Sequence, residues 1–111
     1  MSEFRVKCRN GTGDIVLSVV GAVDLATAPE LDQAIKQALD GPGRRLVLDL
    51  RGVDFMDASG VAILLRHDQR ARAAARPFVV VRGPPQVQRL FDLTELSARI
   101  AIVDELPRFA S

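Results

Sequence analysis

The sequence of 111 residues predicts a single α/β domain with a mixed, mostly parallel β-sheet, an N-terminal antiparallel hairpin and alternating helices. Two observations predict this class. Runs of β-branched or alternating apolar residues take turns with apolar residues at helical spacing, in the order β-β-α-β-α-β-α-β-α. Only a short turn separates the first two strands, whereas a helix separates each later pair, which favours parallel neighbours joined by right-handed connections.

The composition is typical of a soluble globular protein. Hydrophobic residues make up 48% of the chain, which is enough for a sizeable core and too many for a disordered chain. The formal net charge of +1 gives no general attraction to nucleic acid or to acidic membranes. We see no signal peptide and no run of about 18 apolar residues, and the single cysteine has no partner for an internal disulfide. We therefore expect a cytoplasmic protein that binds neither nucleic acid nor a membrane.

The first two strands are expected to form the hairpin. Residues 4–9 alternate between apolar and polar side chains, as an edge strand does, and residues 15–20 are strongly β-branched. Between them, residues 10–14 combine asparagine, glycine and aspartate, which are typical of a tight turn. Cys8 lies on the apolar face of the first strand, and we expect it to be a small buried side chain.

The first helix is expected to begin at Thr27 and to end near Leu39. Thr27 and Glu30 have the spacing of a capping box, and Pro29 suits a first helical turn. Residues 40–43 include two glycines and a proline, and they end the helix. Apolar residues recur on one face of this helix: Leu31, Ile35, Ala38 and Leu39.

The central strand and the helix after it enclose the most informative stretch. Residues 44–50 are rich in branched apolar side chains, as a buried strand is. We expect a loop over residues 54–60 that enters a helix at Ser59 and Gly60, and a helix end near Pro77. Apolar residues follow the loop at helical spacing: Val61, Leu64, Leu65, Ala71 and Ala75.

Ser59 stands at a position with specific electrostatic properties. The first backbone N–H groups of a helix have no partner within it, so a serine side chain can cap them, and the positive end of the helix dipole suits an anion. A phosphate on Ser59 would find these donors in place, and would add roughly −1.5 to −2 charges beside Asp57. From local physics alone, the alternative is a serine that only caps the helix.

The helix after Ser59 carries further polar residues. His67 has no second histidine or cysteine at ligand spacing, so we expect no metal site. It lies two helical turns from Ser59, about 12 Å by helical rise, which is too far for a general base acting on that hydroxyl. We therefore expect no enzyme activity. Four arginines form either a docking face for an acidic partner or a solvated polar side: Arg66, Arg70, Arg72 and Arg76.

The last third of the chain predicts two strands and two short helices. Residues 78–82 are β-rich and follow a helix, so this strand is expected to be parallel to the central one. Residues 83–85 can open a helix over residues 86–92, and residues 98–103 form the last strand. Asp104 can cap a brief terminal helix.

One segment resembles a known signature. Residues 54–61 read Asp54-Phe55-Met56-Asp57-Ala58-Ser59-Gly60-Val61. They resemble the F-x-D-S-S/T-G-aliphatic signature of STAS domains, specifically of bacterial anti-sigma factor antagonists. In that family a partner serine kinase, which is also the anti-sigma factor, phosphorylates the hydroxyl residue before the glycine. The resemblance therefore implies that Ser59 is phosphorylated; Ala58 replaces the first serine of many relatives, which leaves Ser59 as the single hydroxyl of the stretch.

Two further blocks resemble the same family, and together the blocks imply a STAS domain over residues 4–105. Residues 21–28 resemble the block G-x-aliphatic-D-x-x-T/S-A/S, whose aspartate lies near the phosphorylated loop. By this resemblance Asp24 borders the site of Asp57 and Ser59. Residues 87–96 resemble V-x-x-L/I-F/L-x-L/I-T/S-G-L, with Glu95 in place of the glycine, so the turn there is expected to differ. The implied residues that line the site and contact the partner are Asp24, Thr27, Asp57, Ala58 and Gly60.

The resemblance implies an anti-sigma factor antagonist. Unphosphorylated, it would bind the anti-sigma factor and serine kinase and release the sigma factor, and phosphorylation of Ser59 would end binding. A serine phosphatase would be a further partner, and ATP and Mg²⁺ would belong to the kinase, so this chain needs no cofactor. We expect a monomer or weak dimer. The alternatives are a constitutive STAS scaffold subunit of a signalling or lipid-transport assembly, without phosphorylation, and a small nucleotide-binding or hydrolytic protein.

Overall fold

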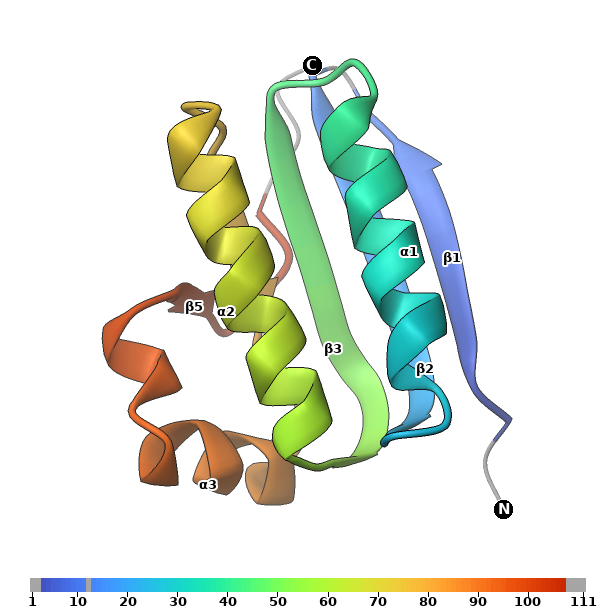
Figure 1. Cartoon of the computed structure of the whole chain (residues 1–111), viewed down its shortest axis with the longest axis vertical. Helices are drawn as coiled ribbons and strands as arrows, with labels where there is room; N and C mark the ends of the chain where they lie inside the picture. The colour runs from blue at the N-terminus through green and yellow to red at the C-terminus, as the bar shows by residue number, and fades with distance from the viewer. Residues whose placement is uncertain (1–2, 12, 108–111) are drawn as a thin grey trace.

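A five-stranded sheet in the order β1-β2-β3-β4-β5 forms the centre of the molecule (Figure 1). The structure is a computed structural model that describes residues 3–11 and 13–107. The antiparallel pair β1–β2 stands at one edge, and β2, β3, β4 and β5 are parallel. The elements are β1 (Arg5–Asn10), β2 (Asp14–Val23), α1 (Ala28–Asp40), β3 (Arg45–Met56), α2 (Ala58–Ala73), β4 (Phe78–Val81), α3 (Pro85–Leu93), the 3-10 helix η1 (Leu96–Ala98) and β5 (Ala101–Val103).

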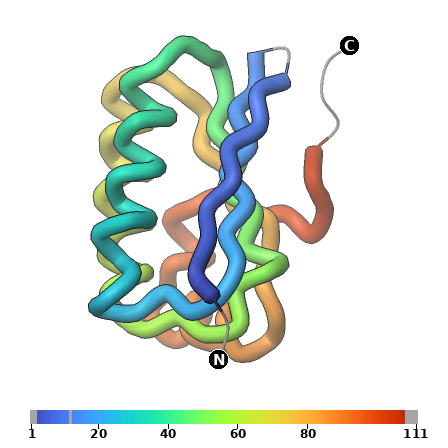
Figure 2. The backbone as a smooth tube through the Cα atoms, turned by 90° about the vertical axis from the view of Figure 1, so that its right-hand side faces the viewer, coloured from blue at the N-terminus to red at the C-terminus, as the bar shows by residue number. Residues whose placement is uncertain are grey.

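The two faces of the sheet are covered differently. Helices α1 and α2 lie side by side over one face, and the stretch after β5 lies on the other (Figures 1 and 2). Between the helices and the sheet is the main core, because alternate strand residues point toward the helices. Its fully buried members include Leu17, Leu31, Ile35, Leu46, Leu48, Leu50 and Leu64. A smaller cluster on the other face joins Val16, Val47 and Val81 to Val103 and Leu106.

The predicted fold class is confirmed, and the main differences concern where elements begin and end. Strand β3 continues to Met56, so the expected loop over residues 54–60 is wrong. The extra residues have a partner because β2 also continues past Val20 and pairs with them through two register shifts. Gly21 lies at the second shift with φ +101°, a conformation that favours glycine. The residue pattern of each strand, taken alone, did not reveal that β2 and β3 extend each other.

Other boundaries differ for local reasons. Helix α2 ends at Ala73, and Ala75 has φ +54° and is exposed, so its predicted place on the apolar face is wrong. The last strand begins at Ala101 because η1 precedes it. Glu95 adopts φ +61°, the left-handed conformation that suits the glycine it replaces. Residues 104–107 are not helical, and residues 108–111 and Thr12 lie outside the described part of the chain.

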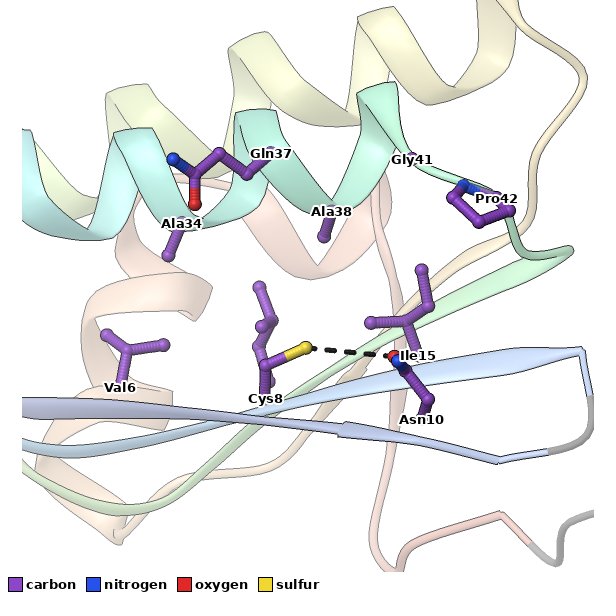
Figure 3. A pocket seen from close by; sticks show the side chains of 10 residues that line it. Val6, Cys8, Asn10, Ile15, Ala34, Gln37, Ala38, Gly41 and Pro42 are labelled. Carbon is purple, nitrogen blue, oxygen red and sulfur yellow. Dashed lines mark hydrogen bonds between the residues drawn. The ribbon is translucent and has the colours of Figure 1, made fainter.

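Cys8 is exposed, so the expectation of a buried side chain is wrong. Its strand is the outermost of the sheet, and the residues of α1 that face it are small, as Figure 3 shows for Ala34 and Ala38. The helix therefore does not reach the strand to cover the thiol. Within the described residues, no helix combines the length and the hydropathy that crossing a membrane requires.

A buried histidine joins α1 to α2. His67 is 2% exposed, and its Nε2 lies 2.6 Å from Asp32 Oδ1 while its Nδ1 lies 3.3 Å from Arg70 Nη1. These contacts fit the neutral ring, in which Nε2–H donates to Asp32 and Nδ1 accepts from Arg70. Burial holds the pKa of His67 below its usual value of 6.5, although the bond to Asp32 opposes that shift. The hydrogen bond from Arg66 lowers the pKa of Asp32.

These shifts predict a pH-dependent stability. Below pH 6.5 the histidine of the unfolded chain binds a proton, whereas the lowered pKa of His67 keeps it neutral in the folded chain. The free energy of unfolding should therefore fall as the pH drops from 7.5 to 5, by at most about 1.4 kcal/mol per pH unit. The contribution of Asp32 is lost only below its ordinary value of 3.8, outside this window. Urea unfolding at several pH values measures the slope.

The His67→Gln variant is the control, because His67 is the single histidine of the sequence. Its stability should be nearly constant between pH 7.5 and 5. Equal slopes for the variant and the parent protein would show that His67 does not cause the dependence.

Candidate functional site

The carboxyl ends of β2 and β3 bring two acidic turns together. Val23 and Met56 are register partners at the ends of these parallel strands, and the backbone N–H of Asp57 donates to the carbonyl of Val23 at 3.1 Å. Asp24 directly follows β2, and Asp57 directly follows β3. The predicted site residues therefore gather at one end of the sheet, where α1 and α2 begin (Figure 1). We call Asp24, Thr27, Asp57, Ala58, Ser59 and Gly60 the Ser59 site.

Asp57, and not Ser59, caps helix α2. Its backbone is extended, and its Oδ1 accepts a hydrogen bond from the backbone N–H of Ser59 at 2.8 Å. Its carbonyl accepts from the N–H groups of Gly60 and Val61, at 3.1 and 3.5 Å. The expectation that Ser59 caps the helix is therefore wrong. The Ser59 N–H, one of the donors expected to be ready for a phosphate, is already bonded to Asp57.

Ser59 is the second residue of α2 and is partly exposed. Within residues 3–11 and 13–107, its hydroxyl has no hydrogen-bond partner. The side chain is therefore not sealed in the core, and its oxygen can be reached from solvent.

The Asp24 carboxylate organises the neighbouring turn. Its Oδ1 accepts from the backbone N–H groups of Ala26 and Thr27, at 3.0 and 3.1 Å. The hydroxyl of Thr27 donates to the carbonyl of Ala22 at 2.7 Å and accepts from the N–H of Asp24 at 3.0 Å. The predicted capping box of Thr27 with Glu30 is therefore wrong, because the hydroxyl points back to the strand and makes no cap bond to α1.

Gly60 allows α2 to start close to the strand ends. A Cβ at this position would lie 2.6 Å from Met56 Cγ, which is closer than side chains approach one another, and 3.0 Å from Val23 Cγ1, which is a tight contact. Gly60 is buried between the two strands and the helix. Its contribution is thus close packing, which fixes the height of Ser59 above the sheet.

Two exposed apolar side chains stand close in the sequence to residues of the Ser59 site, and neither exposure was predicted from the sequence. Leu25, next to Asp24, is 80% exposed, and Phe55, two residues before Asp57, is 50% exposed. Each follows or precedes the strand end by one or two residues, so both lie toward the end of the sheet that carries the Ser59 site. Their position beside an aspartate could not have revealed them, because Val23 and Val53 also stand beside aspartates and are buried.

The arginines of α2 do not form a free basic face. Arg66 pairs with Asp32 at 2.6 Å, Arg70 with Asp40 at 3.0 Å and Arg72 with Asp68 at 2.8 Å. The Arg76 guanidinium donates to three carbonyls at the end of α1, those of Ala38, Leu39 and Gly41. These arginines are paired within the protein, so the ion pairs favour the interpretation of a polar side over that of a docking face.

Within the described residues, no group of three or more histidines, cysteines or acids is arranged to hold a metal ion. His67 is bonded to Asp32 and Arg70 at the seam between the helices. It therefore does not serve Ser59 as a base.

Comparison with known proteins gives a consistent result. A family model described as "Mlab, STAS domain" matches residues 9–104. The chain is 35% identical over 81 residues to the anti-sigma-F factor antagonist RsfB of Mycobacterium tuberculosis, which covers 73% of this chain and 66% of RsfB, or about two thirds of that relative's length. It is 30% identical over 91 residues to the anti-sigma-B factor antagonist of Listeria monocytogenes, covering 82% and 80% of the two chains.

A solved structure is similar over nearly the whole chain. The anti-sigma factor antagonist of Mycobacterium paratuberculosis superimposes with a TM-score of 0.88 at 30% identity, covering 94% of this chain and 88% of that one. The arrangement of strands and helices around the Ser59 site is thus shared with a structure bearing that name.

The capping geometry predicts the effect of two single substitutions on stability. Asp57→Ala removes the acceptor of the Ser59 N–H and should lower the free energy of unfolding by about 1 kcal/mol. Ser59→Ala removes a hydroxyl without a described partner and should change it by less than about 0.5 kcal/mol. Urea unfolding of both variants at pH 7.5 measures the difference, and a larger loss for Ser59→Ala would restore Ser59 as the cap.

Proposed function

Because the chain belongs to the STAS domain family, we propose that it is an anti-sigma factor antagonist that is switched by phosphorylation of Ser59. Unphosphorylated, it binds an anti-sigma factor that is also a serine kinase, and so releases a sigma factor. Phosphorylation ends that binding, and a serine phosphatase restores it. The protein acts in the cytoplasm and is a binding protein, while ATP and Mg²⁺ belong to the kinase.

One observation carries this proposal: at the start of α2, the partly exposed Ser59 has a hydroxyl with no hydrogen-bond partner among the described residues. A kinase must reach a hydroxyl with its phosphate donor, and a serine used as a helix cap would first have to break its cap bond. Here Asp57 supplies the cap, so Ser59 is left for another use. The names of the relatives support the same function.

The docking surface combines the Ser59 site with Leu25 and Phe55. Both side chains are largely in solvent, and covering them with a partner would stabilise a complex by the hydrophobic effect. An aromatic residue near the centre of a contact surface often contributes much of the binding energy. The exposed apolar groups would therefore supply affinity, and the Ser59 hydroxyl would supply control.

Charge explains how one phosphate can end binding. The phosphate adds roughly −1.5 to −2 charges next to Asp57, whose carboxylate already holds the Ser59 N–H. The phosphate cannot accept from the Ser59 N–H without displacing the Asp57 carboxylate, which is also negative. The phosphate would therefore extend away from the protein, toward the bound partner. Each acidic group of the partner at 4 Å would then cost about 1 kcal/mol in water and about 4 kcal/mol at an effective dielectric of 20. A cost of about 1.4 kcal/mol already lowers affinity tenfold.

A second candidate is a constitutive STAS scaffold that is not phosphorylated. The observation that favours it is the description of the matching family model, which names Mlab and not an antagonist. For this function Ser59 would be a surface residue, and binding to an assembly would not respond to its charge.

The first test compares Ser59→Asp with Ser59→Ala in binding to a purified candidate anti-sigma kinase, by calorimetry. We expect Ser59→Ala to bind like the parent protein and Ser59→Asp to bind at least about tenfold more weakly, because it adds a negative charge at the contact. Intact mass with site mapping, after incubation with kinase and ATP, should show one phosphate on Ser59 and none on Ser59→Ala. A phosphate elsewhere, or equal affinities of both variants, would support the scaffold function.

The second test addresses the apolar contacts. Phe55→Ala should weaken kinase binding about tenfold, because the buried ring area is lost, while the free energy of unfolding stays nearly constant. Leu93→Ala is the matched control, since Leu93 is 77% exposed at the end of α3, outside the Ser59 site. An equal effect of both substitutions would show that Phe55 is not a specific contact.

A further inference from the structure

A hollow of about 360 Å³ lies between β1 and α1, far along the helix from the Ser59 site (Figure 3). It exists because small residues stand where a helix usually places large ones. Ala34 and Ala38 point from α1 toward the strand, and Val6 and Cys8 point back from β1. Gly41 and Pro42 close one end. The side chains are too short to meet across the gap, so the space between the edge strand and the helix stays open.

The lining of this hollow is mostly apolar and carries no charged side chain. Its floor consists of Ile15 and Leu17, which belong to the main core and are 5% and 2% exposed. Three polar side chains also border it: the thiol of Cys8 and the amides of Asn10 and Gln37. Among the residues that the structure describes, no charged side chain lines the hollow. The basic residues of β1 alternate with its lining residues and therefore lie on the other face of the strand.

From this geometry we propose that the hollow binds a small uncharged aliphatic molecule that carries one hydrogen-bonding group. The volume lies at the small end of the range for ligand pockets, which favours a medium-length chain. The aliphatic part contacts the apolar floor and walls, and the amide of Asn10 or Gln37 bonds the polar group. A charged headgroup is excluded by complementarity, because nothing in the lining would pair with it and its desolvation would be costly. The proposal does not rest on the function proposed for Ser59.

Two probes of equal chain length test the choice of ligand. Octanamide carries a neutral amide, and octanoate carries a negative charge on the same chain. Nuclear magnetic resonance titration of the parent protein should show saturable shifts with octanamide, at a dissociation constant on the order of 0.1–1 mM, centred on β1 and the second half of α1. Octanoate should bind at least about tenfold more weakly. Absence of saturation with octanamide, or equal binding of octanoate, would overturn the proposal.

Cys8 provides an independent readout, because it is the single cysteine of the sequence and lies in the lining. Its reaction with a soluble thiol reagent should slow about tenfold when octanamide is present at about ten times its dissociation constant. Unchanged reactivity at saturation would place the ligand elsewhere and overturn the proposal.

Variants that fill the hollow complete the test. Ala34→Leu adds apolar volume from the helix and should abolish saturable binding while the melting temperature stays equal or rises. Cys8→Val replaces the thiol on the strand side by an apolar side chain of similar size. This variant should retain binding, which would show that the thiol itself is not required. If Ala34→Leu fails to fold, Gln37→Leu, on the rim, should weaken octanamide binding several-fold without filling the floor. Full binding by a folded Ala34→Leu protein would overturn the proposal.

Discussion

The parallel pairing of β2 with β3 is the constraint on which the rest of the structure depends. The two strands pair along most of their length and end together at Val23 and Met56. Because parallel strands end at the same edge of a sheet, the residues that follow them meet there although they are distant in the sequence. Asp24 and Asp57 therefore become neighbours, and the N–H of Asp57 is bonded to Val23. Gly60 then lets α2 start directly above this junction.

Hydrogen bonds of charged and polar side chains hold together the two helices that frame the site. His67 and Arg66 of α2 both reach Asp32 of α1, and Arg76 bonds the carbonyls at the end of α1. These bonds join α1 to α2, and both helices begin at the Ser59 site. In the proposed switch, a phosphate would alter the electric field at a contact without rebuilding the fold. The same helix α1 contributes to two places at once: its start borders the Ser59 site, and its second half lines the hollow beside β1.

Much of the fold could be predicted because its signals are local. The order of strands and helices, the N-terminal hairpin and the parallel orientation of β3 and β4 all followed from periodicity and connection length, and the structure confirms them. The position of Ser59 near a helix start was also predicted from neighbouring residues alone. What failed were side-chain partners. The cap of α2, the direction of the Thr27 hydroxyl and the pairing of four arginines each depend on a group that the spacing of residues does not reveal.

By itself, therefore, the sequence determined the α/β class, the family resemblance and a serine at the start of a helix. The tertiary structure decided that β2 and β3 extend each other, and that Leu25, Phe55 and Cys8 are exposed. It also decided that Asp57 accepts from the Ser59 N–H, while the Ser59 hydroxyl has no partner among the described residues. The physical reason is the range of the interactions. Backbone propensity and hydrophobic period act within a few residues, whereas burial, ion pairing and strand extension require groups that only the folded chain brings together.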